Sequence, residues 1–534
     1  MENNTRLSGN SSVTLYVKDF GAVGDGCTDD AKAIYAAIEA LKAQASGSVL
    51  EFEADKTYLY KDNGTDCKVI FDFKHNKDLT VRGNNCLIMI GGHGNAYADI
   101  RFCENMTLEG INFDFAEYKP AFAAELESFD METGTAVLIA DRDINLADGE
   151  CYSLHPWLFG TLGTPYSRYY IWFEKYEMLD RAARRVRVYL KKIASGEATK
   201  IYHTNYADQA IQIFTDESLH KKFGLILPMP IPPYSRLTEI SFECRHNKDF
   251  TLRNINFYTN PYHCMMITGG RGEFLFENVN FVRAPYDQDL HFTSWGDLFH
   301  ITDNRAKFVW KGCKIEHPFD DVFNMMNTTM YVYNKHSDSE VTLTAVGAWY
   351  GVPEILPGDV LTILDKKTGK LIGKPIVAET EEHLPPAQIR LSDQDLLRVR
   401  FTEPLPDLRE GREVLVWDES CTYDPASEMI DCEMDGTFRA RTNMTFTNCR
   451  FHIRRFWAGL EVPQEGSLPR DILFRNCEFT DDDGVFPNDL PPWLIRSYNS
   501  VEDGYRIENI VFENCTGIDY GKILKDPYDE VIIR

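Results

Sequence analysis

A short motif recurs along most of this chain and constrains the fold more than any other feature. Residues 75–83 (HNKDLTVRG) nearly recur as residues 246–254 (HNKDFTLRN), and weaker copies end near residues 113, 281, 315, 451, 479 and 515. One column of the aligned copies holds residues that tolerate left-handed backbone: Gly83, Gly110, Asn254, Asn278, Gly312, Asn448, Asn476 and Asn514. The next column is apolar and small or medium in size: Ile111, Ile255, Val279, Cys313, Cys449, Cys477 and Cys515.

A repeat of 24 or more residues, with a corner residue and an inward apolar position, is typical of a parallel β-helix. We therefore predict an all-β solenoid in which each turn of the chain stacks on the one before. Asn254, Asn278 and Gly312 should share one corner, and the 34-residue second interval implies that part of that turn loops out. The four cysteines of the apolar column then form an interior ladder of free thiols rather than disulfides or metal ligands.

The repeat stops twice, and the interruptions define the predicted domains. Each gap exceeds a hundred residues and reads as alternating strands and turns, so we expect a small β-barrel in each. These barrels would wall a cleft or contact another subunit. Near the N-terminus, Thr28 is a plausible helix cap, and Ile34, Ile38 and Leu41 share a helical face. The predicted order is 1–115 (cap and first coils), 116–238 (first insertion), 239–328 (coils with the candidate site), 329–439 (second insertion) and 440–534 (last coils).

Charge and hydropathy bear on the partners and the location to expect. The 56 basic and 82 acidic residues give a net charge of 56 − 82 = −26, which argues against binding to nucleic acid or to anionic membranes. No apolar run is long enough to span a bilayer, and the start of the chain lacks the apolar core of a signal peptide. We expect a cytoplasmic protein, or else a secreted or periplasmic one whose export signal has been removed.

Three carboxylates are brought together by the repeat length. Asp297 precedes Asp320 by 23 residues and Asp321 by 24, which is one regular turn of the predicted solenoid. Residues one turn apart should lie at strand spacing, roughly 4.8 Å. Carboxylates that close favour a proton on one and a charge on another, and glycoside hydrolysis needs one acid and one base. An acidic pair that merely caps a corner of the solenoid is the alternative.

Other side chains within one or two turns could bind a sugar. They offer hydrogen bonds or an aromatic platform, and they are His263, Trp295, His300, His317 and Asn324. Arg455 and Trp457 follow a later copy of the repeat and could also project towards a sugar, although a surface cation–aromatic patch explains them equally well. No metal site and no cofactor are predicted.

Residues 16–30 (YVKDFGAVGDGCTDD) resemble the opening of the pectin-lyase-like, right-handed β-helix superfamily. This resemblance implies the fold but not the reaction, because lyases, hydrolases and tailspikes share it. The arrangement of Asp297, Asp320 and Asp321 resembles two inverting hydrolase families, the polygalacturonases and glycoside hydrolase family 110. The chain shows no equivalent of the His-Gly and Arg-Ile-Lys motifs of polygalacturonases. Family 110, whose members also carry β-barrel insertions, is therefore the better resemblance.

The resemblance to family 110 implies an exo-acting, inverting α-galactosidase that releases terminal α-1,3-linked galactose without a cofactor. Asp320 would be the general acid, and Asp297 and Asp321 would hold and activate water. Since an inverting enzyme keeps its acid and base roughly 6.5–9.5 Å apart, we expect the side chains to splay. The expected partner is a glycan with terminal α-galactose, and a homo-oligomer could form through the inserted domains. The alternatives are another inverting, polygalacturonase-like β-helix glycosidase and a non-catalytic carbohydrate-binding β-helix.

Overall fold

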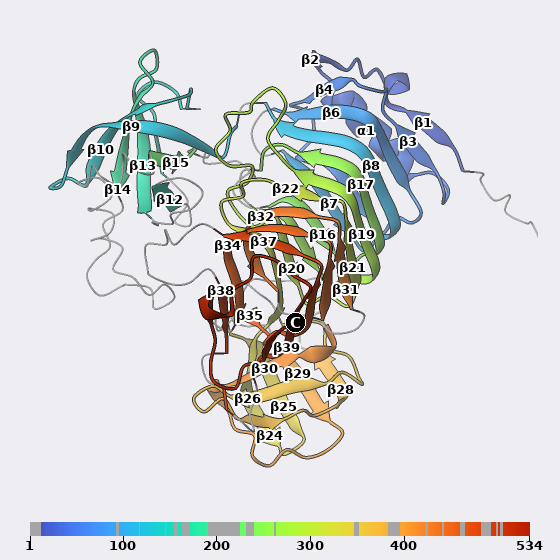
Figure 1. Ribbon diagram of the computed structural model, residues 1–534. Helices are drawn as coiled ribbons and strands as arrows, with labels where there is room; N and C mark the ends of the chain where they lie inside the picture. Colours follow the sequence, from blue (N-terminus) through green and yellow to red (C-terminus); the bar gives the residue numbers. More distant parts are fainter. Residues whose placement is uncertain are drawn as a thin grey trace, which may run out of the picture.

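The structure is a computed structural model that describes most of residues 12–534. The residues it does not describe within that range are 92–94, 117, 145, 154–158, 163–170, 191–224, 231–239, 261–262, 347–351, 383–395, 422–425, 441–442, 460–464, 482–492, 498–499 and 502–505. A sheet of 27 strands winds into a solenoid, and two smaller sheets project from it (Figure 1). Nearly all pairings within the large sheet are parallel, as the repeat predicts.

The register of the strands gives the length of each coil. Strand β17 (Lys248–Phe257) pairs with β19 (Arg271–Phe281), and β20 (Phe299–Thr302) pairs with β23 (Asp321–Thr328), both at the interval that separates Asn254 from Asn278. Between them, β18 (His263–Thr268) pairs with β20 at the larger interval that separates Asn278 from Gly312. Both predicted intervals are therefore observed, and the longer coil is the one expected to loop out.

The remaining strands of the large sheet continue the same winding from the N-terminal to the C-terminal end, except for the short β35, which pairs antiparallel with β23. They are β1 (Thr14–Tyr16), β2 (Asp25–Asp29), β3 (Val49–Glu51), β4 (Thr57–Tyr60), β5 (Val69–Lys74), β6 (Thr80–Ile90), β7 (Ala96–Arg101), β8 (Glu104–Phe115), β16 (Ile240–Arg245), β21 (Lys307–Lys311), β22 (Lys314–Ile315), β31 (Ser427–Ile430), β32 (Glu433–Arg439), β33 (Met444–Thr447), β34 (Arg450–Gly459), β35 (Glu465–Gly466), β36 (Arg470–Arg475), β37 (Glu478–Asp481), β38 (Trp493–Arg496), β39 (Glu508–Glu513), β40 (Ile523–Leu524) and β41 (Val531–Ile533).

The predicted corner column adopts left-handed backbone. Asn254, Asn278 and Gly312 have φ values of 52°, 53° and 60°, and the Asn278 amide donates to Asn254 Oδ1 at 2.9 Å. Short polar side chains tolerate this conformation and here also bond from coil to coil. Gly83 departs from the column: the two residues that follow it take the positive φ, and a Cβ at Gly83 would lie 2.4 Å from the carbonyl oxygen of Gly110.

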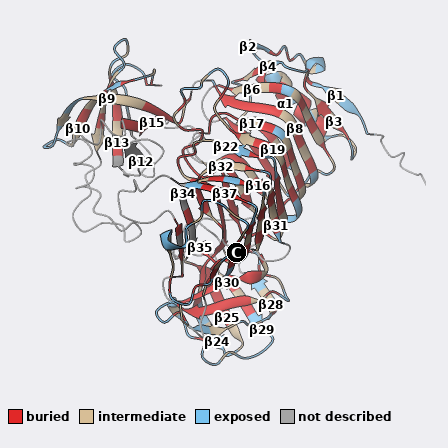
Figure 2. Cartoon of the chain, in the orientation of Figure 1, coloured by how far each residue is buried: buried red, intermediate tan, exposed pale blue. Residues whose placement is uncertain are grey.

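The apolar column points into the core, as predicted. Ile255, Val279 and Cys313 are buried, and the ring of Phe257 stacks on those of Phe113 and Phe281 from adjacent coils. Figure 2 shows this buried lining along the solenoid. The thiol ladder is Cys313, Cys432, Cys449, Cys477 and Cys515, and none of these residues forms a disulfide.

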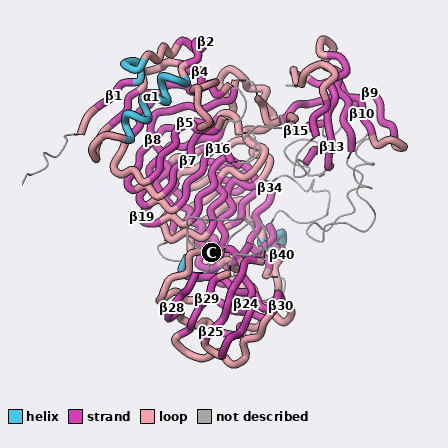
Figure 3. The backbone as a smooth tube through the Cα atoms, turned by 180° about the vertical axis from the view of Figure 1, so that it is seen from behind, coloured by secondary structure: helices cyan, strands magenta, loops and turns pink. Residues whose placement is uncertain are grey.

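An amphipathic helix covers the first coils, where Figure 3 shows it against the N-terminal strands. It is α1 (Ala31–Lys42), and Ile34, Ile38 and Leu41 are buried on one face as predicted. The residue before it is Asp30, whose carboxylate accepts hydrogen bonds from the amides of residues 23 and 24. The Thr28 hydroxyl donates to Asp25 instead, so Thr28 is not the cap. Among the described residues, no helix has the length and apolar character needed to cross a bilayer.

The first insertion is a closed barrel. Antiparallel pairings run from β13 through β14, β10, β9, β15 and β12 and back to β13, while β11 extends the sheet beside β13. The strands are β9 (Ala121–Asp130), β10 (Thr135–Ala140), β11 (Cys151–Ser153), β12 (Phe159–Leu162), β13 (Ile171–Asp180), β14 (Arg185–Leu190) and β15 (Leu225–Pro228). They lie within the predicted bounds of 116–238.

The second insertion has its own hydrophobic core. Its strands are β24 (Met330–Ser337), β25 (Glu340–Ala345), β26 (Leu361–Asp365), β27 (Leu371–Gly373), β28 (Val377–Glu382), β29 (Leu397–Phe401) and β30 (Gly411–Asp418). An isolated antiparallel β-bridge between Val360 and Ile376 joins the segments that precede β26 and β28. Strands β31 and β32 pair with β21 and β22, so residues 427–439 belong to the solenoid and not, as the interrupted repeat suggested, to the insertion.

Short 3-10 helices lie at Val17–Phe20, Glu419–Cys421 and Tyr520–Lys522.

Candidate active site

Three aspartates meet where two adjacent coils enter their strands. Asp297 leads into β20 and Asp321 opens β23, and the Leu298 amide donates to the Asp321 carbonyl at 3.0 Å. One carboxylate oxygen from each of Asp297, Asp320 and Asp321 lies within 4.8 Å of the other two. Asp297 and Asp321 are buried, whereas Asp320 is half-buried. The structure thus brings together the trio that the 23- and 24-residue spacing predicts, but their nearest oxygens do not splay to the separation expected of an inverting enzyme.

Two histidines surround Asp297. His300 Nδ1 lies 2.7 Å from Asp297 Oδ2, and the backbone N–H of Asp297 donates to His263 Nδ1 at 3.2 Å. Burial lowers the pKa of His263 to about 4, so its ring is neutral near pH 7 and carries its proton on Nε2. Burial by itself would raise the pKa of Asp297, but the hydrogen bond from His300 and the charges of His300, Arg439 and His263, whose ring is protonated at the low pH where Asp297 titrates, lower it to about 2. Asp297 is therefore an anion across the physiological range.

Arg439 supplies a positive charge at the centre of the cluster. Its Nε lies 2.7 Å from Asp321 Oδ2, and its Nη1 lies 2.7 Å from Glu465 Oε2. Burial opposes the charged form, but Asp321, Glu465, Asp297 and Asp320 together raise the pKa of Arg439 well above its usual value. The guanidinium therefore offsets part of the negative charge of the surrounding carboxylates.

The spacing of the sequence did not point to Arg439 or Glu465. Arg439 pairs in register with Asn324, although the whole second insertion separates the two residues along the chain. The signal that could have located it is the dipeptide Asp431-Cys432, which matches the corner and thiol columns; Asp431 has a φ of 53°. Glu465 comes from β35, which pairs antiparallel with the end of β23.

Asn324 lies between His300 and Arg439 in the strand register. It is buried, and its Oδ1 accepts no hydrogen bond from the described part of the chain. Asn324 therefore occupies the register position that His300, which binds Asp297, occupies in the preceding coil. Its role as a sugar contact stays a prediction.

Trp295 does not form an open platform. Only 2 % of the residue is exposed, and its ring stacks on that of Phe319, with centroids 4.2 Å apart and an interplanar angle of 2°. Phe292 packs edge-on against both rings. The expectation that Trp295 offers a free face to a sugar is therefore wrong, because the residue fills the core of the turn that carries Asp297.

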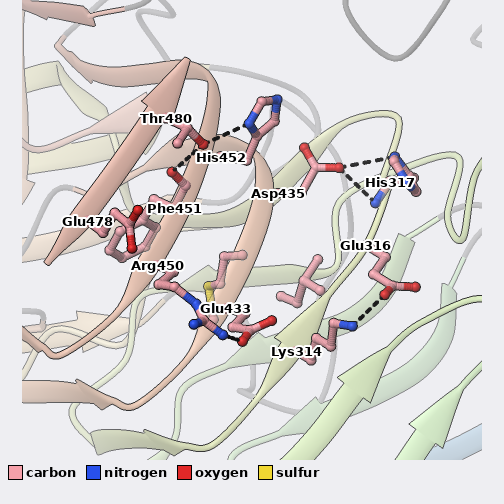
Figure 4. A pocket seen from close by; sticks show the side chains of 12 residues that line it. Lys314, Glu316, His317, Glu433, Asp435, Arg450, Phe451, His452, Glu478 and Thr480 are labelled. Atoms are coloured by element: carbon pink, nitrogen blue, oxygen red, sulfur yellow. Dashed lines mark hydrogen bonds and ion pairs between the residues drawn. The ribbon is translucent and has the colours of Figure 1, made fainter. Parts of the chain in front are cut away.

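His317 faces a different part of the surface. It lines a shallow groove of about 350 Å³ over β22, β32, β34 and β37, where its Nδ1 lies 3.1 Å from Asp435 Oδ2 (Figure 4). The Arg283 guanidinium lies 3.4 Å from His317 Nε2. In the described part of the chain, the side-chain contacts of His317 are thus with Asp435 and Arg283 and not with the three aspartates. The side chains of the two remaining candidates, Arg455 and Trp457, lie outside the described part of the structure.

The site contains donor atoms that a cation could use, in two overlapping sets: His263, Asp297 and His300, and the three aspartates. Both histidine nitrogens nearest to Asp297 are already engaged with it, and Arg439 lies against Asp321. These ring nitrogens of His263 and His300 and the Asp321 carboxylate are therefore already engaged in hydrogen bonds or ion pairs within the protein. The arrangement supplies fixed anions beside a more accessible carboxyl, which is the equipment of acid–base chemistry.

The sequence matches no protein-family model and no curated protein. Solved structures similar to it include PfbA, a surface adhesin of Streptococcus pneumoniae, at 12% identity and a TM-score of 0.35 over 94% of this chain and 81% of that one. Another is the A-module of the mannuronan C-5 epimerase AlgE4 of Azotobacter vinelandii, at 10% identity and a TM-score of 0.33 over 97% of both chains. A third is a family 28 exopolygalacturonase of Yersinia enterocolitica, at 12% identity and a TM-score of 0.32 over 98% of this chain and 70% of that one.

None of these likenesses points to glycoside hydrolase family 110, and none carries an activity over to this chain. The strand register and the winding of the sheet stand on their own. The chain is a right-handed parallel β-helix protein, capped by one helix and interrupted by two β-barrel-like insertions.

Proposed function

We propose that this protein is a glycoside hydrolase, specifically an exo-acting, inverting α-galactosidase that releases terminal α-1,3-linked galactose. The observation that carries the proposal is the convergence of carboxylate oxygens of Asp297, Asp320 and Asp321 within 4.8 Å of one another. The three carboxylates differ in their burial and in their charged and hydrogen-bonding partners. The choice of galactose and of its linkage comes from the resemblance of this triad and of the two insertions to family 110.

The roles follow from the environments. Asp297 is anionic through its hydrogen bond to His300, and Asp321 is ion-paired with Arg439. A proton on Asp320 relieves the repulsion among three adjacent carboxylates, and Asp320 is also the most accessible of them. Asp320 therefore donates a proton to the leaving glycosidic oxygen. Asp297, with Asp321, accepts a proton from the attacking water and orients it.

The close approach of the carboxylates favours a second candidate mechanism. Carboxyl groups about 5–5.5 Å apart are typical of retaining glycosidases, in which one carboxylate attacks the sugar directly. The separation of the nearest oxygens here, within 4.8 Å, lies nearer to that value than to the wider spacing of inverting enzymes. In that case Asp297 or Asp321 would be the nucleophile, and Asp320 would remain the acid.

The two mechanisms differ in the first product. Proton NMR during hydrolysis of α-1,3-galactobiose would show β-galactose first for inversion and α-galactose first for retention. A screen of nitrophenyl glycosides together with this disaccharide, with and without a chelator, tests the activity itself. Asp62→Asn is a matched control, since that carboxylate is 70% exposed and lies in the N-terminal coils. A protein that binds glycans without cleaving them, or whose three aspartate-to-asparagine variants match wild type, would overturn the proposal.

A further inference from the structure

The turn that delivers Asp297 is unusually long. In the coils on either side, the chain passes between the same two register positions by a short segment, from Phe257 to Met265 and from Ile315 to Phe323. Between these coils, the corresponding segment runs from Phe281 to Phe299 and is more than twice as long. We call residues 282–298 the long turn. Because more than half of it exceeds the regular coil, neighbouring coils offer no matching backbone to pair with the excess.

The first barrel contacts the middle of the long turn through Asp141 and Arg142, and we call these contacts the grip. The Arg142 guanidinium, which follows β10 of that barrel, donates through Nη2 to the carbonyl oxygen of Asp289 at 2.9 Å. Its Nη1 lies 3.7 Å from Asp287 Oδ2. The adjacent residue, Asp141, places Oδ2 3.2 Å from His291 Nε2. Two consecutive barrel residues thus hold three residues of the long turn.

The barrel is a firm anchor for these contacts. Its strands close into a ring, and the Asp141 amide donates to the Ala123 carbonyl on β9 at 2.8 Å, while the Ala123 amide donates to Asp141 Oδ1 at 2.9 Å. Lys119, just before the barrel, adds a second positive charge 3.5 Å from Asp287 Oδ2. The residues that contact Asp287 and Asp289 therefore belong to, or directly adjoin, a barrel that is stabilised by its own backbone hydrogen bonds.

Contacting aromatic side chains connect the residues held by the barrel with the three aspartates. His291 is followed by buried Phe292, whose ring touches those of Trp295 and Phe319. Trp295 lies two residues before Asp297, and Phe319 lies immediately before Asp320. A displacement of residues 287–291 would therefore be felt at both carboxylates, because packed rings transmit a shift rather than absorb it.

We propose that Arg142 of the first barrel is a positioning residue, which fixes the long turn and thereby the place of Asp297 beside Asp321. The kinetic consequence rests on the proposed glycosidase function, whereas the effect on the long turn does not. An error of about 1 Å in a catalytic group costs up to about a hundredfold in rate, so loss of the grip should appear in kcat.

The structural test is hydrogen–deuterium exchange on the full chain. In Arg142→Gln, peptides covering residues 282–298 should exchange about tenfold faster, while peptides from β17, β19 and β23 keep their protection. The matched control is Arg185→Gln in the same barrel, because Arg185 on β14 bonds to Glu127 on β9 and not to the long turn. Exchange in residues 282–298 that equals wild type in Arg142→Gln would overturn the proposal.

The kinetic test compares kcat with KM on α-1,3-galactobiose. Arg142→Gln should lower kcat about tenfold with KM within about twofold, and Arg142→Lys should recover part of the loss because a charge returns without the fork-shaped donor. Asp287→Asn, made from the other side of the contact, should lower kcat in the same direction. An unchanged kcat in Arg142→Gln despite faster exchange would show that the grip does not position Asp297. A wild-type protein without glycosidase activity would sink the proposed function and leave the exchange result standing.

Discussion

The ring of Trp295 lies flat against the ring of Phe319, with centroids 4.2 Å apart and planes inclined by 2°. Each ring is a neighbour in sequence of one of the gathered carboxylates, since Asp297 follows Trp295 by two residues and Asp320 follows Phe319 by one. The stack therefore joins the two chain segments that carry Asp297 and Asp320.

Removing this stack should weaken both the fold and catalysis. Trp295→Ala should lower the free energy of unfolding by about 3–5 kcal/mol, because it leaves a large cavity in the turn. Trp295→Phe preserves a stacked ring and serves as the control, with KM for nitrophenyl α-galactoside within about twofold of wild type. Urea unfolding and steady-state kinetics measure the two effects. A severalfold rise in KM in Trp295→Phe, with kcat unchanged, would instead mean that the ring touches the substrate.

Asp320→Asn should separate substrates by their leaving groups. Without a proton donor, we expect kcat/KM for α-1,3-galactobiose to fall by about 10²–10⁴-fold, and that for dinitrophenyl α-galactoside to fall far less, since its leaving group needs no proton. Asp297→Asn should impair both substrates alike. Equal losses on both substrates in Asp320→Asn would reassign the acid.

Arg439 forms ion pairs with both Asp321 and Glu465, and we expect its removal alone to destabilise the fold. Arg439→Gln leaves two buried carboxylates without their cation and should lower the free energy of unfolding by about 3–5 kcal/mol. The double variant Arg439→Gln/Glu465→Gln should recover part of this loss, because it removes one of the stranded charges. Chemical denaturation of the single and double variants measures the difference, and a double variant that is less stable than Arg439→Gln would contradict the expectation.

Stability should depend on pH through Asp303, where the solenoid meets the second insertion. Burial and the nearby Asp418 raise the pKa of Asp303 to about 6, although Thr328 donates two hydrogen bonds to it. A carboxyl with a raised folded pKa contributes stability that is fully present below pH about 4 and is lost as the pH rises through 6. The loss amounts to at most about 3 kcal/mol. Asp303→Asn should therefore flatten the decline in unfolding free energy between pH 4 and 8, and a variant with the wild-type slope would refute the assignment.

The thiols should differ sharply in reactivity. Cys27 and Cys151 are exposed, whereas Cys313, Cys432, Cys449 and Cys477 are buried in the ladder. In the native protein, Ellman's reagent should titrate Cys27 and Cys151 first, because exposure governs access to the thiolate. Cys27→Ser should remove one fast-reacting thiol, and the four buried thiols of the ladder should react only on unfolding. Fast reaction of ladder thiols under native conditions would contradict their interior position.

The sequence alone determined the solenoid, its corners and the meeting of the aspartates. Corner residues such as Asn254 and Asn278 and inward residues such as Ile255 obey a requirement that every coil repeats, so their pattern is legible without coordinates. Because Asp297 and Asp321 are separated by one regular coil, the same periodicity that builds the fold also brings them together.

Only the tertiary structure decided what surrounds the aspartates. Arg439 reaches Asp321, and Glu465 reaches Arg439, from the far side of the second insertion, whose length bears no relation to the coil period. The direction of Trp295 was likewise hidden, because its turn is more than twice the regular length and its packing depends on Phe292 and Phe319. Periodic sequence specifies neighbours along a regular stack, whereas contacts made by insertions and long turns depend on packing in three dimensions.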